Sequence, residues 1–410
     1  MSKDSGVSVT FPRGFRAAGG ACGVKDSGRP DLCLIAADGP CAAAGVFTTN
    51  VFKGAPVLVG MRHLARGGGR ARAVVCNSGN ANVATLAAGG EDDAIAMCRA
   101  AAEAVGCEPI EVLPASTGII GRPLPIERIT AGIAGLGTQL GVGPEHDRLA
   151  AEGILTTDLV TKTTHHTFEI GGTEVRLGGI AKGSGMIAPS MATMLVFITT
   201  DVSIAPTALD AALKQANAAS FSRMSVDGDT STSDTVYVLA NGDAGNATIE
   251  SAEGEAFERF TEALTEVCRR LADAIVRDGE GATRTFEVRV RGCKSIEDAD
   301  RLGRSVTNSP LVKCAIHGLD PNWGRLVMAA GKAGADLNPD RFTVKIQGVT
   351  VFADRRPAVT EPDALAALSA KMDTDRVVID LDAHRGDGEA TWLGCDLSRQ
   401  YVAINADYTT

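Results

Sequence analysis

The segment from Ile180 to Thr200 carries the densest set of residues that could do chemistry. It reads Ile-Ala-Lys-Gly-Ser-Gly-Met-Ile-Ala-Pro-Ser-Met-Ala-Thr-Met-Leu-Val-Phe-Ile-Thr-Thr, so that Thr193 stands just before an apolar run. A threonine hydroxyl needs a base to act as a nucleophile, and a free α-amine on the same residue can supply one. Cleavage of the bond between Ala192 and Thr193 would release that amine. One interpretation is therefore a self-cleaving chain whose nucleophile is Thr193.

Two other interpretations of this segment remain open on the residues alone. Residues 183–188 fit the dinucleotide-binding pattern G-x-G-x-x-A, but that pattern requires a helix to begin at the glycines. Pro189 and the apolar run from Met194 leave no length for such a helix. The segment could also be a glycine-rich loop that leads into a buried strand, with Lys182 solvated at its rim.

Apolar patterns predict the elements that must position these residues. The longest predicted helix runs from Glu255 to Arg277, where apolar side chains recur every three or four residues until Asp278-Gly279 ends it. Shorter helices are predicted from Glu91 to Val105 and from Pro206 to Ala219. Because helices alternate with strands and no linker divides the chain, we expect one compact α/β assembly. Strands are predicted at Ala44–Thr49, Ala73–Asn77, Met194–Thr200, Thr235–Leu239, Thr285–Val290, Phe342–Phe352 and Arg376–Leu381.

The composition narrows the classes of partner. Among 410 residues, 50 acidic side chains outnumber 40 basic ones, and a net charge of -10 disfavours nucleic acid as a partner. The first residues form no apolar signal, and no run of 18 uncharged apolar residues follows, so we expect a cytoplasmic protein without membrane contact. The ten cysteines include no C-x-x-C and the six histidines no H-E-x-x-H, so we expect reduced cysteines and no metal site.

Several further motifs accompany the segment around Thr193. They stand at Gly14–Gly19, Val46–Asn50, Asn77–Asn82, Ser116–Ile119, Thr156–Asp158, Asp227–Ser231, Asp278–Thr283, Asp320–Arg325 and Ile404–Thr410. In this order, over nearly the whole chain, they resemble the ornithine acetyltransferases, also called bifunctional glutamate N-acetyltransferases, of arginine biosynthesis. The strongest match is Lys182–Leu195, which is similar to the processing site of that family.

The resemblance implies a fold, a processing event and a reaction. The fold would be α/β, a self-processing N-terminal-nucleophile-like αββα sandwich with an additional C-terminal α/β region. Self-cleavage would yield an alpha chain, residues 1–192, and a beta chain, residues 193–410, with two copies of each in a heterotetramer. The threonine matching Thr193 would accept acetyl from N-acetylornithine and pass it to glutamate without a metal or organic cofactor. Some members of the family also take acetyl from acetyl-CoA.

The resemblance also implies roles for single residues. Thr117 and Gly118 would form the oxyanion hole, and a Ser-Thr-Gly-Ile turn can aim one hydroxyl and one backbone N–H at a developing oxyanion. Lys182 would lie close to the nucleophile and substrate, where a cation lowers the pKa of the Thr193 α-amine. The sequence departs from the family pattern after Asp158 and at Arg284, which concerns substrate specificity. The expected substrate-binding residues are Thr156, Lys182, Thr193, Glu280, Asn405 and Thr410.

Two other functions fit the same residues. An N-terminal-nucleophile amidohydrolase or aminopeptidase would use Thr193 with water as the acceptor, and a non-catalytic binding protein on the same scaffold would neither cleave nor acetylate. Acetyl-CoA would require a phosphate site, and the only compact, basic and glycine-rich stretch, Arg62–Arg72, is predicted to be a solvated loop between two strands. N-acetylornithine is therefore the expected donor.

Overall fold

Strand β2 (Leu32–Phe47) organises the larger of two β-sheets in the computed structural model, which describes residues 7–188 and 194–407. The first half of β2 pairs with β1 (Phe15–Gly20) and β3 (Arg70–Asn80), and its second half pairs with β9 (Thr235–Ala240). β2 therefore belongs to two half-sheets at once. The order β4-β3-β2-β9-β7-β6-β5 is completed by β4 (Val112–Ile119), β5 (Lys162–Ile170), β6 (Thr173–Lys182) and β7 (Leu195–Thr200).

The two half-sheets stack face to face around a shared apolar layer. Leu195 and Phe197 of β7 lie in this inner layer together with side chains from β3 and β4, while the intervening residues of β7 face helices outside. The Tyr237 hydroxyl of β9 crosses the layer and donates a hydrogen bond to the Pro114 carbonyl of β4 at 3.1 Å. Alternation along each strand thus creates one inner and two outer layers.

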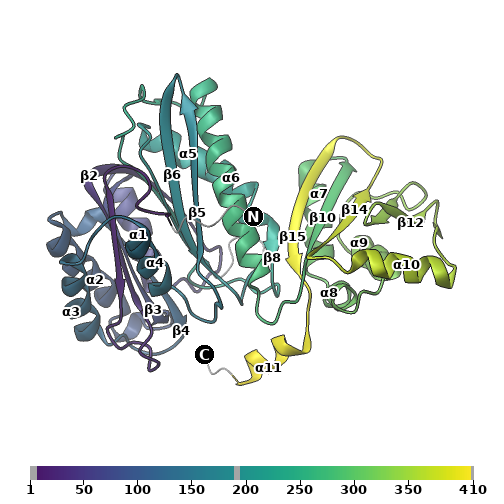
Figure 1. Cartoon of the computed structure of the whole chain (residues 1–410), viewed down its shortest axis with the longest axis horizontal. Coiled ribbons are helices and arrows are strands. Elements are labelled where there is room, and N and C mark those ends of the chain that lie inside the picture. The colour runs from purple at the N-terminus through teal and green to yellow at the C-terminus, as the bar shows by residue number, and fades with distance from the viewer. Residues whose placement is uncertain (1–6, 189–193, 408–410) are drawn as a thin grey trace.

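Helices cover both outer faces of the stacked half-sheets (Figure 1). The expected αββα sandwich is therefore confirmed. On the side of β3 and β4 lie α1 (Ala55–Arg66), α2 (Gly90–Val105) and α3 (Ile126–Gly137), and on the side of β5 and β6 lie α5 (Pro206–Ala218) and α6 (Glu255–Arg277), while α4 (Pro144–Gly153) packs against β1. Short 3-10 helices stand at Leu86–Ala88, Pro109–Glu111 and Phe221–Arg223.

The C-terminal part forms a second lobe with its own sheet and core (Figure 1). The expectation of one compact assembly is wrong in this respect, because a separate apolar cluster lies between this sheet and the helices on one of its faces. Its strands are β8 (Met224–Ser225), β10 (Thr285–Cys293), β11 (Thr343–Ile346), β12 (Val349–Ala353), β13 (Arg356–Pro357), β14 (Arg376–Asp382) and β15 (Gly388–Cys395). Its helices are α7 (Ile296–Thr307), α8 (Pro310–His317), α9 (Trp323–Gly331) and α10 (Pro362–Met372). After it, α11 (Arg399–Asp407) returns to the junction of the lobes.

The observed helices and strands agree with the predictions for long sequence patterns better than with those for short ones. The helix predicted from Glu255 to Arg277 is confirmed at both ends as α6. The single strand predicted at Phe342–Phe352 is wrong, because Gln347 and Gly348 have positive φ values of 48° and 76° and turn the chain into the β11–β12 hairpin. All ten cysteines are free and most are buried. No helix in the described part of the chain is long and apolar enough to cross a membrane.

Candidate active site

The ends of several strands meet where the resemblance places the site. Lys182 at the end of β6 pairs with Leu195 at the start of β7, and Leu195 pairs in turn with Thr235 at the start of β9. Ala192, Thr193 and Thr410 lie outside the described residues. Met194, which directly follows Thr193 in the chain, belongs to this group of strand ends: its N–H donates to Asp234, and its carbonyl accepts the N–H of Thr235.

Thr117 and Gly118 stand on the last residues of β4 and not in a turn, so the turn predicted there is wrong. Serine, threonine and glycine resemble a turn signal, but the parallel pairing of β4 with β3 continues through them. Gly118 has φ +129°, and a Cβ on it would overlap the backbone of Gly79. The side chain of the preceding Ser116 donates a hydrogen bond to Asn77 at 2.6 Å. Glycine is thus required here, and the strand end is held by its neighbour.

Lys182 is buried, so the interpretation that places it in water at the rim of a glycine-rich loop is wrong. The whole residue is 1% exposed, and its Nζ donates a hydrogen bond to Thr156 Oγ1 at 3.3 Å. Burial lowers the pKa of Lys182, while the nearby carboxylates of Asp158 and Asp234 oppose that shift. Residues 183–188 form no helix, so the dinucleotide interpretation lacks the element it needs.

A buried ionic cluster that the sequence analysis did not single out supports this corner of the site. Lys162 Nζ lies 2.6 Å from Asp158 Oδ1 and 2.6 Å from Asp278 Oδ2, with all three side chains almost inaccessible. Burial alone would raise the pKa of Asp158, but the Lys162 and Lys182 cations outweigh it and hold that pKa below its usual value. Asp158 and Asp278 each belong to a motif of the sequence, Thr156–Asp158 and Asp278–Thr283, yet no spacing rule joins residues so far apart.

Asp158 and Asp278 also fix the backbone around the expected substrate residues. Asp158 accepts hydrogen bonds from the Gly183 N–H at 2.7 Å and from the Thr156 N–H at 3.0 Å. The Asp278 carbonyl accepts from the Ser184 hydroxyl at 2.6 Å. The cluster therefore ties the start of β5, the end of β6 and the end of α6 into one rigid support.

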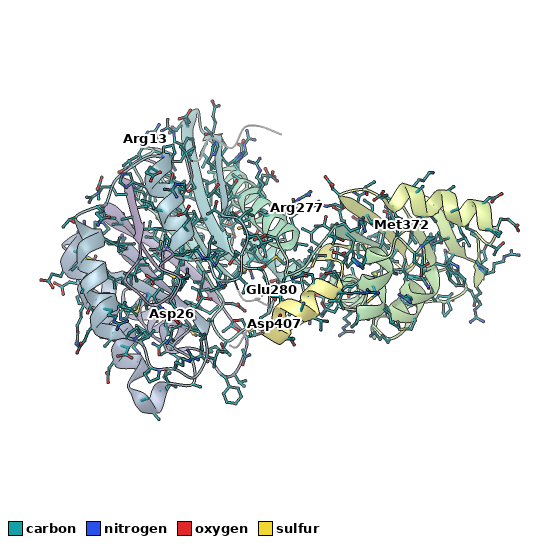
Figure 2. All side chains as sticks on the ribbon, turned by 60° about the horizontal axis from the view of Figure 1, so that its bottom comes forward. Arg13, Asp26, Arg277, Glu280, Met372 and Asp407 are labelled. Carbon is teal, nitrogen blue, oxygen red and sulfur yellow. The ribbon has the colours of Figure 1, made fainter. Side chains whose placement is uncertain are left out.

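Glu280 lies just after α6, at the junction of the two lobes (Figure 2). It is 8% exposed and not a solvated turn, and its N–H donates to the Ser184 carbonyl at 2.8 Å. Asn405 of α11 donates to Glu280 Oε2 at 2.7 Å, so the last described helix docks beside Glu280. A Cβ on Gly185 would overlap the Glu280 carboxylate. The glycine-rich loop and the C-terminal helix therefore meet at this acid.

A cavity of about 400 Å³ opens beside Thr156. Its wall includes Gly79 and Ile119, which flank the proposed oxyanion residues on β3 and β4. Burial lowers the pKa of Lys25 to about 8, although Asp31 opposes the shift. The cavity suits an anionic ligand because its basic wall residues are Lys25, Arg29, Arg122 and Arg128, against the single carboxylate of Asp26.

The stretch Arg62–Arg72 is not the loop between two strands that the sequence predicted. It comprises the end of α1, a glycine turn and the start of β3. Arg62 forms an ion pair with Glu91 at 2.6 Å, and Arg72 donates to the Asp38 carbonyl at 3.0 Å. These side chains are engaged in holding the fold.

In the described ranges, no group of three or more His, Cys, Asp or Glu side chains is arranged to hold a metal ion.

Comparisons with known proteins agree with the sequence motifs. A family model described as the ArgJ family matches residues 16–410. The arginine biosynthesis bifunctional protein ArgJ of Symbiobacterium thermophilum is 46% identical over 407 residues, 98% of each chain. Its namesake in Dehalococcoides mccartyi is 44% identical over 98% of this chain and 97% of its own length. The solved ornithine acetyltransferase of Mycobacterium tuberculosis, complexed with ornithine, shows 42% identity over 45% of this chain and 96% of its own, with a TM-score of 0.41.

Proposed function

The chain belongs to the ArgJ family of bifunctional arginine-biosynthesis enzymes, and from this premise we propose that it transfers acetyl from N2-acetylornithine to L-glutamate through an acetyl ester on Thr193. The observation that carries the proposal is the burial of Lys182 beside Thr156, on the strand position paired with Leu195. A buried cation at the end of β6, paired with the first residue of the strand that follows Thr193, suits a threonine whose own amine must stay unprotonated.

Self-cleavage prepares the nucleophile in this proposal. The Thr193 hydroxyl attacks the Ala192 carbonyl carbon, the C–N bond breaks, and the Thr193 nitrogen takes the hydroxyl proton. The resulting ester joins the two fragments until water hydrolyses it. Ala192 then ends the alpha chain, residues 1–192, with a carboxylate, and Thr193 begins the beta chain, residues 193–410, with a free amine and hydroxyl.

Acetyl transfer uses the same hydroxyl twice. Thr193 Oγ attacks the acetyl carbonyl of N2-acetylornithine while the α-amine takes its proton, and Thr117 and Gly118 stabilise the oxyanion. The amine returns that proton to the ornithine nitrogen as the C–N bond breaks. The glutamate amine then attacks the acetyl ester, restores the Thr193 hydroxyl and leaves as N-acetylglutamate.

In this scheme, charged side chains of the site bind the oppositely charged groups of the substrates. The Glu280 carboxylate binds a substrate ammonium group, and Asn405, Thr156 and Thr410 supply short polar contacts. The basic cavity beside Thr156 receives carboxylates, because Lys25 and its neighbouring arginines line it. No metal or organic cofactor takes part. The cytoplasmic location and the heterotetramer of two alpha and two beta chains stay predictions.

Intact-mass measurement of the purified protein tests the proposal. We expect two fragments divided before Thr193 and, after incubation with N2-acetylornithine, a beta chain heavier by one acetyl group. Thr193→Ala should remove both changes, because one hydroxyl serves cleavage and transfer, while Thr193→Ser should retain some of each. Cleavage of the Thr193→Ala chain at this bond, or an acetyl group on the alpha fragment, would contradict the proposal.

The acceptor and donor need a separate assay. With glutamate at saturation, we expect N-acetylglutamate as the main product, whereas an amidohydrolase or aminopeptidase would release acetate by transfer to water. At equal concentrations, N2-acetylornithine should be a much better donor than acetyl-CoA, because Arg62 and Arg72, two of the four arginines in residues 62–72, are engaged within the fold. Comparable rates with both donors would overturn this preference.

A further inference from the structure

The loop between β8 and β9, residues 226–234, contacts the chain upstream of the proposed cleavage site. The Asp227 carboxylate accepts the N–H of Met186 at 2.6 Å and the N–H of Ile187 at 2.8 Å. The Ile187 carbonyl in turn accepts the N–H groups of Val226 at 2.9 Å, Asp227 at 3.2 Å and Gly228 at 3.3 Å. Both backbone groups of Ile187 are therefore held by one end of this loop.

The other end of the same loop contacts the chain downstream of that site. The Met194 N–H donates to Asp234 Oδ1 at 3.1 Å, and the Met194 carbonyl accepts the N–H of Thr235 at 3.1 Å. Asp234 is fully buried, and burial raises its pKa well above the usual value, although the Lys182 cation opposes that shift. Only residues 188–193 separate the two gripped positions, and of these the structure describes Ala188 alone.

We propose that Asp227 and Asp234 are positioning residues for self-cleavage, which hold Ile187 and Met194 so that the Thr193 hydroxyl can reach the Ala192 carbonyl. This inference rests on the self-cleavage proposed above. Anchoring both ends of a short segment removes much of the conformational freedom that the reacting groups would otherwise have to lose. Neither aspartate takes a proton or forms a bond in this role.

The conformation of Met186 shows that the upstream grip is specific. Met186 has φ +56°, a left-handed conformation that a residue with a side chain adopts only when its surroundings enforce it. The Asp227 carboxylate, which accepts the Met186 N–H, is such a constraint. It also accepts the Tyr401 hydroxyl of α11 at 3.3 Å, so the C-terminal helix helps to fix the carboxylate. Sequence-distant elements therefore converge on the upstream grip.

The hydrogen bonds of Asp227 and of Asp234 hold different fragments once the bond between Ala192 and Thr193 has been cut. Ile187 then belongs to the alpha chain, whereas Met194 remains bonded to the nucleophile. Loss of the Asp227 grip should therefore slow cleavage much more than transfer, and loss of the Asp234 grip should slow both. A residue that merely stabilised the fold would not produce this difference between the two rates.

Conservative substitutions separate the hydrogen bonds from the charge. Asp227 uses both carboxylate oxygens as acceptors for backbone N–H groups, so Asp227→Asn loses one of these bonds. Asp234 uses only Oδ1 for Met194, and Oδ2 has no well-aligned partner among the described residues, although the Ser231 hydroxyl helps to lower the pKa. Asp234→Asn therefore keeps its grip, while Asp234→Ala loses it.

The experiment follows cleavage of the full chain in a cell-free pulse and chase, with intact mass as the readout. Transfer is then measured on fully cleaved protein and normalised to acetylated beta chain. We expect Asp227→Asn and Asp234→Ala to slow cleavage by about 10- to 100-fold, the effect of leaving a backbone N–H without its acceptor. Asp234→Asn should stay within about threefold of the wild type, because the Met194 bond remains.

Asp229→Asn is the matched control, because Asp229 is an exposed acid of the same loop that contacts Asp227 through its backbone N–H. Equal cleavage rates in Asp227→Asn, Asp234→Ala and Asp229→Asn would overturn the inference while leaving self-cleavage intact. Equal losses of cleavage and transfer in Asp227→Asn would also overturn it. An uncleaved wild-type chain, by contrast, would refute the proposed function itself.

Discussion

The two lobes contain sheets of opposite character. In the main lobe, all residues of β7 are buried, because the second half-sheet covers one face and helices cover the other. In the C-terminal lobe, the helices of the lobe cover one face of the sheet, and α6 contacts only part of the other face. There the buried Val288 of β10 alternates with the exposed Arg289 and Arg291. An open face accommodates charge without special partners, whereas a closed one does not.

This difference explains where the candidate active site lies. The half-exposed arginines of β10 pair with Glu287 and Asp380 at the surface of the lobe, where an ion pair contributes little. Inside the main lobe, burying a charge requires compensation, and the buried Lys162 lies between Asp158 and Asp278. This buried, fully paired charge supports the candidate site.

The largest expected effect contrasts a buried cation with an exposed one. Lys162→Met leaves Asp158 and Asp278 as unpaired buried carboxylates and should lower the free energy of unfolding by about 3–5 kcal/mol. Arg291→Met, which removes a half-exposed partner of Asp380, should cost less than about 1 kcal/mol. Urea denaturation of both variants measures the comparison. Equal losses would mean that burial does not distinguish the two lobes.

The second effect concerns the end of β4. Gly118→Ala places a Cβ against the backbone of Gly79 and displaces the strand that carries the proposed oxyanion donors. We expect kcat for transfer to fall by about 100-fold, the usual consequence of losing one such donor. Gly292 in the C-terminal lobe also has a positive φ of 67° and little room for a Cβ, so Gly292→Ala controls for strain alone. Similar losses of kcat in both variants would contradict a local role for Gly118.

The third effect tests the acid at the junction of the lobes. Glu280→Gln removes the charge that we propose for a substrate ammonium group but keeps an acceptor for Asn405. KM for N2-acetylornithine should rise by about tenfold or more, with a smaller change in kcat. Glu287→Gln, on the open sheet of the C-terminal lobe, is the control and should leave KM unchanged. An unchanged KM in Glu280→Gln would remove this residue from the binding site.

The smallest effect is a shift in the pH dependence of transfer. If Lys182 is a cation near the Thr193 amine, it disfavours the ammonium form and lowers the pKa of that amine. Lys182→Met removes the cation, so that pKa should rise and the acidic limb of the rate profile should move upward by about one pH unit. The measurement requires folded, cleaved protein. A limb that stays in place would show that Lys182 acts only through Thr156 and Asp158.

The sequence alone predicted the elements with long, unambiguous patterns and the family of the protein. Helix α6 has a three-to-four-residue apolar repeat over its whole length, and its limits were predicted correctly. Missed strands such as β5 and β6 were less visible, because β5 mixes threonine and histidine with few apolar residues. Short patterns carry little information about pairing, which depends on partners elsewhere in the chain.

Residue types and order along the chain determined which side chains could take part in acyl transfer, since motifs are local chemistry. Only the tertiary structure decided their environments. Lys182 and Glu280 belong to residue types that usually lie on surfaces, yet both are buried here because distant segments cover them. The Lys162–Asp278 ion pair spans 116 positions, and the loop at 226–234 grips residues on both sides of the proposed cleavage site. Burial and hydrogen bonding arise from packing between segments, and no spacing within one segment encodes them.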